Sequence, residues 1–279
     1  MRLILSAAVM SAVMAAAGAA VAEAAGPVII AHRGGASLRP ENTLAAFRHA
    51  LAMGVPVLEF DMNLTADDEI VLHHDSSVNP GVCRLDKATP IRSMTLAQLR
   101  KLDCGSLPRA NSPRYKPSPG EKMPSLDEFL DAVKGSGALL LGETKMPGDN
   151  TVPVDRFVRL IDAAVRKHGL SGRFILQSSD YRTTDRMREL NPRVRICLLS
   201  TRRYKPAYAE VARKHGAHYL MLRLDDASPE QFRALQKAGL KLYSGTSNKP
   251  EEWPRYVELG FDGILTDDPA ALQEYLKSR

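Results

Sequence analysis

The feature that most constrains this chain is a regular alternation of two patterns. From Pro27 onward, short apolar runs rich in β-branched residues alternate with amphipathic stretches of helical period. The alternation repeats about eight times over roughly 250 residues, which is typical of strands paired in a parallel sheet and joined by helices. The expected strands are Val28–Ala31, Val57–Met62, Ile70–His73, Leu139–Glu143, Phe174–Gln177, Arg195–Leu198, Tyr219–Leu222, Leu240–Tyr243 and Gly263–Leu265.

The stretches between these strands carry helix signals at their ends. Ser228 precedes Pro229 and Asp268 precedes Pro269, so each helix start combines a capping side chain with a proline in the first turn. Glycines follow several of the stretches, where helices commonly end. The expected helices are Thr43–Met53, Val154–His168, Asp180–Leu190, Tyr204–Lys214, Pro229–Ala238, Pro250–Leu259 and Pro269–Lys277.

The pattern favours an α/β fold of the (β/α)8 TIM-barrel type over an open, doubly wound sheet. The strands are apolar throughout, as in sheets covered on both faces, and the first turn lacks the G-x-G-x-x-G of dinucleotide-binding sheets. Ile70–His73 follows Val57–Met62 too closely to be a barrel strand, so we expect it to be a short addition. With 44% hydrophobic and 25% charged residues, the composition excludes a disordered chain. We expect one barrel domain over residues 25–279.

A long segment, Ser76–Pro124, interrupts the alternation. It contains seven prolines, a helical stretch near Leu96–Leu102, and two of the three cysteines, Cys83 and Cys104. We expect a loop-rich insertion at about residues 76–124, after the second strand region, that passes over the mouth of the barrel. A bridge between the two cysteines and separate thiols are both compatible with the sequence.

The first 24 residues have the pattern of a signal peptide. Arg2 precedes the apolar run Leu3–Val21, and small residues recur around Ala22–Ala24 as in a cleavage site. A retained membrane anchor is the alternative, which the alanine-rich composition disfavours. We therefore expect export to the periplasm or secretion, without a stable membrane span. The net charge of +6 is scattered along the chain, which suits an anionic small-molecule substrate or the envelope surface and does not indicate nucleic acid.

Polar side chains gather where the expected strands end, and in a barrel these ends form one mouth. Pairs two residues apart on one strand project from the same face. So many acids at one mouth are costly unless a cation neutralises them, and an all-oxygen ligand set favours Ca²⁺ or Mg²⁺ over zinc. The strand-end residues are His32, Arg33, Glu59, Asp61, His74, Glu143 and Lys145.

The blocks around these residues resemble the glycerophosphodiester phosphodiesterase family. The resemblance runs in order from about Gly26 to the C-terminus, and it implies a barrel enzyme that uses a divalent cation to hydrolyse glycerophosphodiesters to glycerol 3-phosphate and an alcohol. The blocks are Ala31-His32-Arg33-Gly34-Gly35, Pro40-Glu41-Asn42-Thr43, Leu58-Glu59-Phe60-Asp61, His74-Asp75, Gly142-Glu143-Thr144-Lys145, Leu176-Gln177-Ser178 and Gly260-Phe261-Asp262-Gly263-Ile264-Leu265-Thr266-Asp267.

The resemblance also implies a role for each strand-end residue. It implies acid–base catalysis by two histidines, with a neighbouring glycerol hydroxyl forming a cyclic phosphate that water then opens. A bidentate arginine and a lysine point charge would hold the phosphate. The residues that take these roles are His32 and His74 for proton transfer, Arg33 and Lys145 for the phosphate, and Glu59, Asp61 and Glu143 for the metal.

Other polar positions have expected structural roles. We expect Glu41 to fix its loop and cap the next helix. For Asp267 and Asp268, capping of the helix at Pro269 is favoured over the alternative, contact with the site residues from behind. His73 faces away from His74 on an extended strand and is not expected to be catalytic. Gln177 is compatible with either substrate contact or a structural role.

Two positions depart from the family pattern. Gly245 stands where the family commonly has tryptophan, and Ser179 where phenylalanine is frequent. Both changes affect the wall around the substrate and leave the metal and phosphate residues intact. Tyr243, Tyr181 or a residue of the insertion are candidates to replace the missing aromatic surface.

Two alternatives to the hydrolase remain at this stage. A phospholipase D-like enzyme of the sphingomyelinase D type shares the histidines and acidic residues but acts on lysolipids. A non-catalytic module would bind phosphodiesters without turnover, although it would not need two histidines. The sequence leaves the alcohol headgroup, the choice of ion, the division of acid and base roles, and the oligomeric state open.

Overall fold

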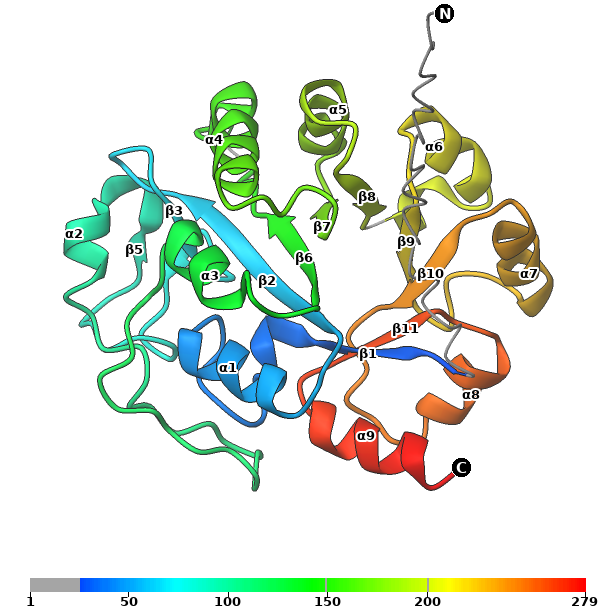
Figure 1. The fold of residues 1–279 in the computed structure, drawn as a ribbon, viewed down its shortest axis with the longest axis horizontal. Coiled ribbons are helices and arrows are strands. Elements are labelled where there is room, and N and C mark those ends of the chain that lie inside the picture. The colour runs from blue at the N-terminus through cyan, green and yellow to red at the C-terminus, as the bar shows by residue number, and fades with distance from the viewer. Residues whose placement is uncertain (1–25, 149, 200) are drawn as a thin grey trace, which may run out of the picture.

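The chain folds into a closed barrel of parallel strands surrounded by helices (Figure 1). The computed structural model describes residues 26–148, 150–199 and 201–279, so the expected signal peptide at residues 1–24 lies outside the described residues. Eight parallel strands follow one another in the order β1, β2, β6, β7, β8, β9, β10, β11, and β11 pairs with β1 to close the ring. Among the described residues, no helix is both long and apolar enough to cross a bilayer.

The strands are β1 (Val28–Ala31), β2 (Val57–Leu64), β3 (Ile70–Leu72), β4 (Ser77–Val78), β5 (Thr89–Pro90), β6 (Leu139–Thr144), β7 (Phe174–Ser178), β8 (Arg195–Leu198), β9 (Tyr219–Leu222), β10 (Lys241–Ser244) and β11 (Gly263–Thr266). The α-helices are α1 (Leu44–Ala52), α2 (Leu96–Leu99), α3 (Leu126–Val133), α4 (Val154–Lys167), α5 (Tyr181–Leu190), α6 (Tyr208–Lys214), α7 (Pro229–Lys237), α8 (Trp253–Glu258) and α9 (Pro269–Lys277). Short 3-10 turns are η1 (His32–Gly34), η2 (Ile91–Ser93) and η3 (Thr201–Tyr204).

The predicted barrel is confirmed, and the prediction differs from the structure at a few elements. β3 pairs antiparallel with β2 outside the ring, as expected of a short addition. Helix α3 was not predicted, although Ser125 and Glu128 form a capping box at its start. The helix expected from Tyr204 begins at Tyr208, because Pro206 has no N–H to give and the preceding turn is a separate 3-10 element.

Alternate residues of each barrel strand point to opposite sides of the wall. On β2, Leu58, Phe60 and Met62 belong to the large cluster between the barrel and its helices. Val57 belongs to the interior cluster, so the same alternation directs Glu59 and Asp61 inward, above an apolar floor. The buried residues of that floor are Ile30, Val57, Leu141, Ile175, Cys197, Tyr219, Met221, Tyr243 and Leu265.

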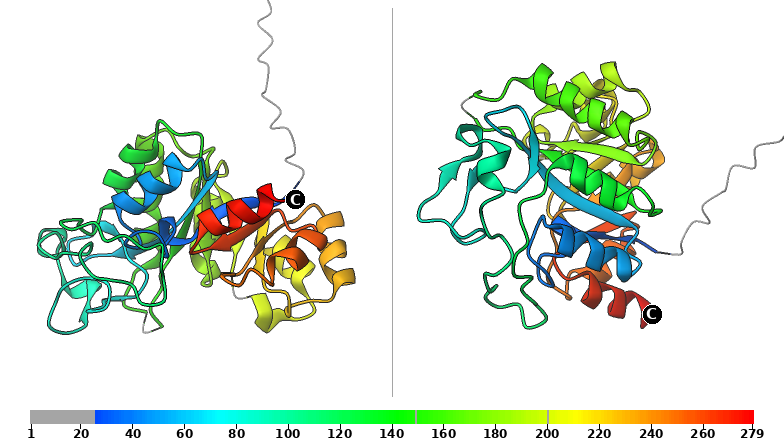
Figure 2. Two further views of the ribbon diagram at one scale, coloured as in Figure 1. Left: turned by 90° about the horizontal axis from the view of Figure 1, so that it is seen from below. Right: turned by 60° about the vertical axis from the view of Figure 1, so that its left-hand side comes forward.

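The insertion has a small core of its own at one side of the barrel, as the cyan to green segments of Figure 2 show. Val78, Ile91 and Leu99 pack there against Val71 of β3. Cys83 and Cys104 lie in the same cluster and form a disulfide, so the bridge that the sequence left open is present. The insertion is thus held together by an apolar cluster and a covalent link.

Candidate active site

A cavity of about 750 Å³ opens at the carboxyl ends of the barrel strands. Five of the seven predicted site residues line it, namely His32, Arg33, Glu59, His74 and Glu143. The other two are Asp61 and Lys145, and Lys145 forms ion pairs with both Asp61 and Glu143. No described residue of the insertion lines the cavity, although Nη2 of its Arg109 lies 3.5 Å from Oδ2 of Asp267. That the insertion passes over the mouth stays a prediction.

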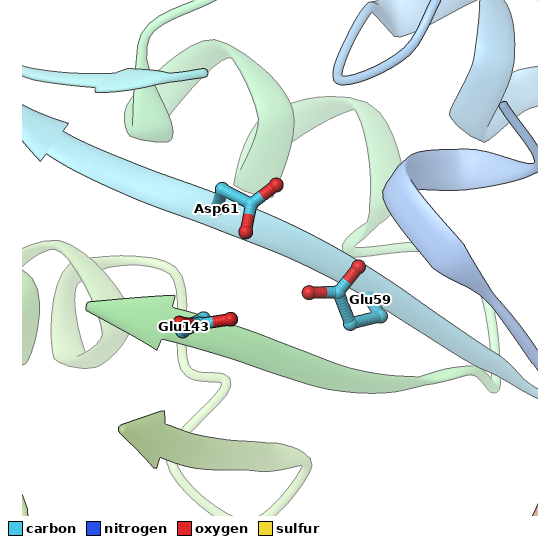
Figure 3. Close-up of side chains that lie close together, drawn as sticks. All are labelled: Glu59, Asp61 and Glu143. Carbon is cyan, nitrogen blue, oxygen red and sulfur yellow. The ribbon is translucent and has the colours of Figure 1, made fainter. Parts of the chain in front are cut away.

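Three carboxylates form the acidic centre of the site (Figure 3). Glu59 and Asp61 project from β2, and Glu143 projects from the neighbouring β6, where it is in register with Asp61. One oxygen of each residue lies within 4.8 Å of the others. Glu59 and Asp61 are 1% and 0% exposed, so water cannot neutralise their charge.

Electrostatics in this acidic centre favour a bound cation. Burial, with the nearby charge of Asp61, raises the pKa of Glu59 to about 8. Burial also acts to raise the pKa of Asp61, but the cations of Lys145 and Arg33 outweigh it and hold the pKa at about 2. Burial raises the pKa of Glu143 as well. The carboxylates are thus only partly neutralised by the protein.

The donor set fits a hard divalent cation. Its ligand atoms are all carboxylate oxygens, which Ca²⁺ and Mg²⁺ prefer. Oδ1 of Asp61 is buried and accepts no hydrogen bond from the described residues, although Lys145 Nζ lies 3.1 Å away as an ion-pair partner. Glu59, Asp61 and Glu143 therefore form a candidate metal centre.

The turn after β1 holds Arg33 against this centre. Arg33 has a φ of 52°, and Gly34 and Gly35 follow with φ of 81° and 94°. A Cβ on Gly34 would lie 2.8 Å from Cβ of Ala46, so the turn needs glycine there. The left-handed backbone conformation of Arg33 costs about 1 kcal/mol or more of folding free energy. In this conformation the Arg33 N–H donates to Oε2 of Glu59 at 2.8 Å, which fixes the carboxylate.

The Arg33 side chain is held by acids on both sides. Its Nη1 lies 2.7 Å from Oε1 of Glu41, and its Nε lies 3.5 Å from Oδ2 of Asp61. Glu41 also binds Arg109 of the insertion at 2.8 Å. The expectation that Glu41 caps helix α1 is wrong, because the side chain of Thr43 caps it. Glu41 is instead a positioning residue for the arginine.

His32, next to Arg33 in the chain, forms a largely buried pair with Asp267. His32 Nδ1 lies 2.6 Å from Oδ1 of Asp267, whose Oδ2 accepts from Asn248 Nδ2 at 2.8 Å. Burial acts to lower the pKa of His32, but Asp267 and Glu59 outweigh it and the pKa is raised. The expected capping role holds for Asp268, whose carboxylate accepts from Ala271 N, and is wrong for Asp267. The sequence signal for Asp267 was its place at the end of β11.

His74 has a similar carboxylate partner in a more open place. Its Nδ1 lies 2.7 Å from Oδ1 of Asp75, and 37% of its side chain is exposed. His73 is buried, does not line the cavity, and its N–H donates to the Asp61 carbonyl at 3.1 Å. The two pairs His32–Asp267 and His74–Asp75 each engage Nδ1, so proton transfer to a substrate in the cavity falls to Nε2.

The missing aromatic surface is replaced by a residue that sequence reasoning did not find. Tyr243 packs on Tyr219 in the apolar floor, and neither Tyr243 nor Tyr181 lines the cavity. At Gly245, a Cβ would lie 2.9 Å from Cγ of Arg223, so the arginine stem covers the glycine. Arg223 lines the cavity, and no local motif marked it.

Gln177 also lines the cavity and contacts the acidic centre. Its Nε2 donates to Oε2 of Glu143 at 3.3 Å. Its Oε1 is buried and has no hydrogen-bond donor among the residues described. Gln177 therefore orients Glu143 and presents a free acceptor beside it.

The barrel and its strand-end groups define the class of barrel enzymes that act on phosphate esters at a carboxylate-rich mouth. Within that class, the chain belongs to the glycerophosphoryl diester phosphodiesterase family, whose sequence profile matches residues 32–271.

Relatives support this membership over almost the whole chain. A glycerophosphodiester phosphodiesterase of Caldanaerobacter subterraneus subsp. tengcongensis is 28% identical over 88% of this chain and 96% of its own. The crystal structure of a putative glycerophosphoryl diester phosphodiesterase from Silicibacter pomeroyi has a TM-score of 0.82 and 28% identity, covering 90% of this chain and 93% of that chain. An Oleispira antarctica phosphodiesterase, solved with its product sn-glycerol-3-phosphate, shares the fold with a TM-score of 0.78 and 23% identity, over 90% of this chain and 97% of that one.

The acidic centre predicts an unusual response to Glu59→Gln. A pKa raised from 4.5 to about 8 means that the unfolded chain releases a proton which the metal-free fold retains, so stability falls as the pH rises through this range. At pH 8 we expect Glu59→Gln to raise the melting temperature without metal and to lose the stabilisation by added Ca²⁺ or Mg²⁺. That stabilisation is about 2.7 kcal/mol for wild type at a metal concentration of about 100 Kd. Calorimetry with and without EDTA measures both effects.

The exposed helix residue Glu258 supplies the control for this experiment. Glu258→Gln removes the same charge from the end of α8, outside the cavity lining. It should change neither the metal-free melting temperature nor the response to metal. A full metal response in Glu59→Gln would contradict the assignment of the acidic centre.

The His32–Asp267 pair predicts the direction of a titration shift. Asp267→Asn removes a charge that raises the pKa of His32. Burial, which lowers this pKa, then has a larger net effect, so the pKa falls. NMR titration of the His32 ring measures this change. Asp268→Asn, which retains an oxygen for the helix cap, should leave the titration as it is. An equal shift in both variants would show that Asp267 has no special part.

Proposed function

We propose that this chain is a metal-dependent glycerophosphodiester phosphodiesterase that releases sn-glycerol 3-phosphate and an alcohol. One observation carries the proposal. Three carboxylates, two carboxylate-paired histidines and a fixed arginine converge on one cavity in a barrel of this family. The carboxylates suit a cation, the arginine suits a phosphate, and the histidines suit proton transfer.

The geometry supports a role for each group in the reaction. Arg33 is held with its guanidinium between Glu41 and Asp61, so it is ordered before an anionic phosphate arrives. Lys145 adds a point charge next to Asp61 and Glu143. The cation that Glu59, Asp61 and Glu143 would hold supplies Lewis-acid polarisation of the phosphate.

In this proposal the two histidines carry out proton transfer. Asp267 fixes Nδ1 of His32 and stabilises its protonated form, so Nε2 exchanges a proton with the reacting oxygen. Asp75 contacts Nδ1 of His74 at 2.7 Å and so orients that ring. In the proposed reaction one histidine takes the proton of the glycerol hydroxyl that attacks phosphorus, and the other protonates the alcohol oxygen that leaves. Water then opens the cyclic phosphate to give glycerol 3-phosphate. The all-oxygen ligand set supports either Ca²⁺ or Mg²⁺.

The test is release of glycerol 3-phosphate from glycerophosphoglycerol and glycerophosphocholine by the mature protein. We expect release that EDTA abolishes and that Ca²⁺ or Mg²⁺ restores. His32→Ala and Glu59→Gln should each lower kcat by about 10²- to 10⁴-fold, since they remove proton transfer and a metal ligand. His49→Ala, on the outer helix α1, is the matched control and should retain activity.

Other outcomes would overturn the proposal in distinguishable ways. Turnover of intact lysolipids alone would indicate the sphingomyelinase D type of enzyme. Binding of phosphodiesters without turnover under both metals would indicate a binding module.

We also propose that the protein is exported to the periplasm or secreted. The apolar leader at residues 1–24 supports this, and the Cys83–Cys104 disulfide suits an oxidising compartment. Protein recovered from the envelope or medium should begin near residue 25. In denaturant without reductant it should show one titratable thiol, that of the buried Cys197. Retention of residues 1–24 or three free thiols would contradict the proposal.

A further inference from the structure

The side of the cavity that faces the acidic centre across the barrel is lined by basic side chains. In the ring of eight strands, β9 lies opposite β2, which carries Glu59 and Asp61. Three arginines from the segments after β8 and β9 line the cavity there, and we call them the arginine wall: Arg202, Arg203 and Arg223. None of the predicted catalytic or phosphate-binding residues belongs to this wall.

Arg203 is fixed in place without a carboxylate. Its guanidinium lies 5.3 Å from the ring centre of Tyr181 and 5.0 Å from that of Tyr204. Its Nη2 also donates to the Ser179 carbonyl at 3.0 Å. These contacts with rings and a carbonyl orient the cation, and Asp180 is the acid whose charge it interacts with at longer range. No carboxylate among the described residues forms an ion pair with it.

Arg223 is similarly free of acidic partners in the described part of the chain. Its aliphatic stem lies over Gly245, where any side chain would collide with it. Its backbone N–H donates to Oδ2 of Asp226 at 2.8 Å, which fixes the start of the loop after β9. The stem is therefore placed by packing, and the guanidinium stays available to a ligand.

Arg202 differs from the other two, because acids already neutralise it. Its Nε lies 2.8 Å from Oδ1 of Asp226, and its Nη2 pairs with Asp225. Lys205 lies near the same acids, with Nζ 3.9 Å from Asp226. Asp225 and Asp226 thus pair with Arg202 and Lys205, whereas Arg203 and Arg223 form no ion pair with the described carboxylates.

We propose that the arginine wall binds a second anionic group of the substrate, so that diesters whose alcohol carries a phosphate or carboxylate are preferred. This inference rests on the proposed function. A substrate whose phosphodiester lies at Arg33 and the acidic centre extends toward β9, where two guanidinium groups that form no ion pair with the described residues offer forked hydrogen bonds to an anion. A cationic choline group would meet like charge in the same place.

The test compares two substrates that differ by one phosphate. These are glycerophosphoglycerol and glycerophosphoglycerol with a terminal phosphate. Glycerophosphocholine, whose alcohol is cationic, is the third substrate. We expect kcat/KM to be about tenfold or more higher for the phosphorylated diester, and lowest for the choline diester. Arg223→Gln and Arg203→Gln should each lower kcat/KM for the phosphorylated substrate about tenfold more than for the neutral one. Added salt should reduce the preference.

Arg255→Gln, on the outer helix α8, removes the same charge away from the cavity and should preserve the preference. Equal kcat/KM for the neutral and phosphorylated diesters would overturn the inference while the proposed function stands. Equal loss of preference in Arg255→Gln and Arg223→Gln would overturn it as well, because a general charge effect would explain the result. Hydrolysis of none of the diesters would overturn the proposed function and this inference with it.

Discussion

The burial of three carboxylates inside a barrel is the constraint on which the rest of the site depends. Glu59 and Asp61 are almost inaccessible, and an ionised carboxylate in such a place is strongly disfavoured without partners. The protein places two cationic side chains, Lys145 and Arg33, next to these acids, so their positive charge is smaller than the negative charge of the three carboxylates. Each surrounding feature either supplies further compensation or fixes the acids in place.

This requirement connects parts of the chain that are far apart in sequence. Asn42, with a φ of 55°, donates to Oδ2 of Asp61 and accepts from its backbone N–H, so the loop before α1 is tied to β2. Arg109 of the insertion binds Glu41, which in turn holds Arg33. The insertion therefore helps to hold Arg33 through one intermediate residue, although no described residue of it lines the cavity.

Local patterns predicted the barrel well, because each strand and helix is defined by the spacing of its own apolar residues. They predicted the seven site residues as one group for a related reason: parallel strands bring their carboxyl ends to one mouth. The different roles of adjacent residues were harder to predict. Asp267 and Asp268 both precede Pro269, and only the fold shows that one contacts a histidine 235 positions away while the other caps a helix.

The arginine that covers Gly245 was hidden from sequence reasoning for another physical reason. Its contact joins the loops after β9 and β10, and neither loop has a periodic pattern that would predict the other's conformation. Helix α3 was missed although its capping box is local, because it directly follows the proline-rich insertion. Long-range contacts between irregular segments thus define the limit of prediction here.

The alternation along β2 has a consequence for how this chain tolerates changes of length. Shifting the strand by one residue would exchange Glu59 and Asp61 with Leu58, Phe60 and Met62, which would place the charges in the helix layer and apolar groups in the cavity. Deleting one residue of β2 would therefore disrupt both the packing of the barrel and the arrangement of the acidic centre. Residues 76–124 carry a separate small core and line no part of the cavity, so the parts of that segment away from Arg109, which binds Glu41, are where the chain has room to lengthen or shorten.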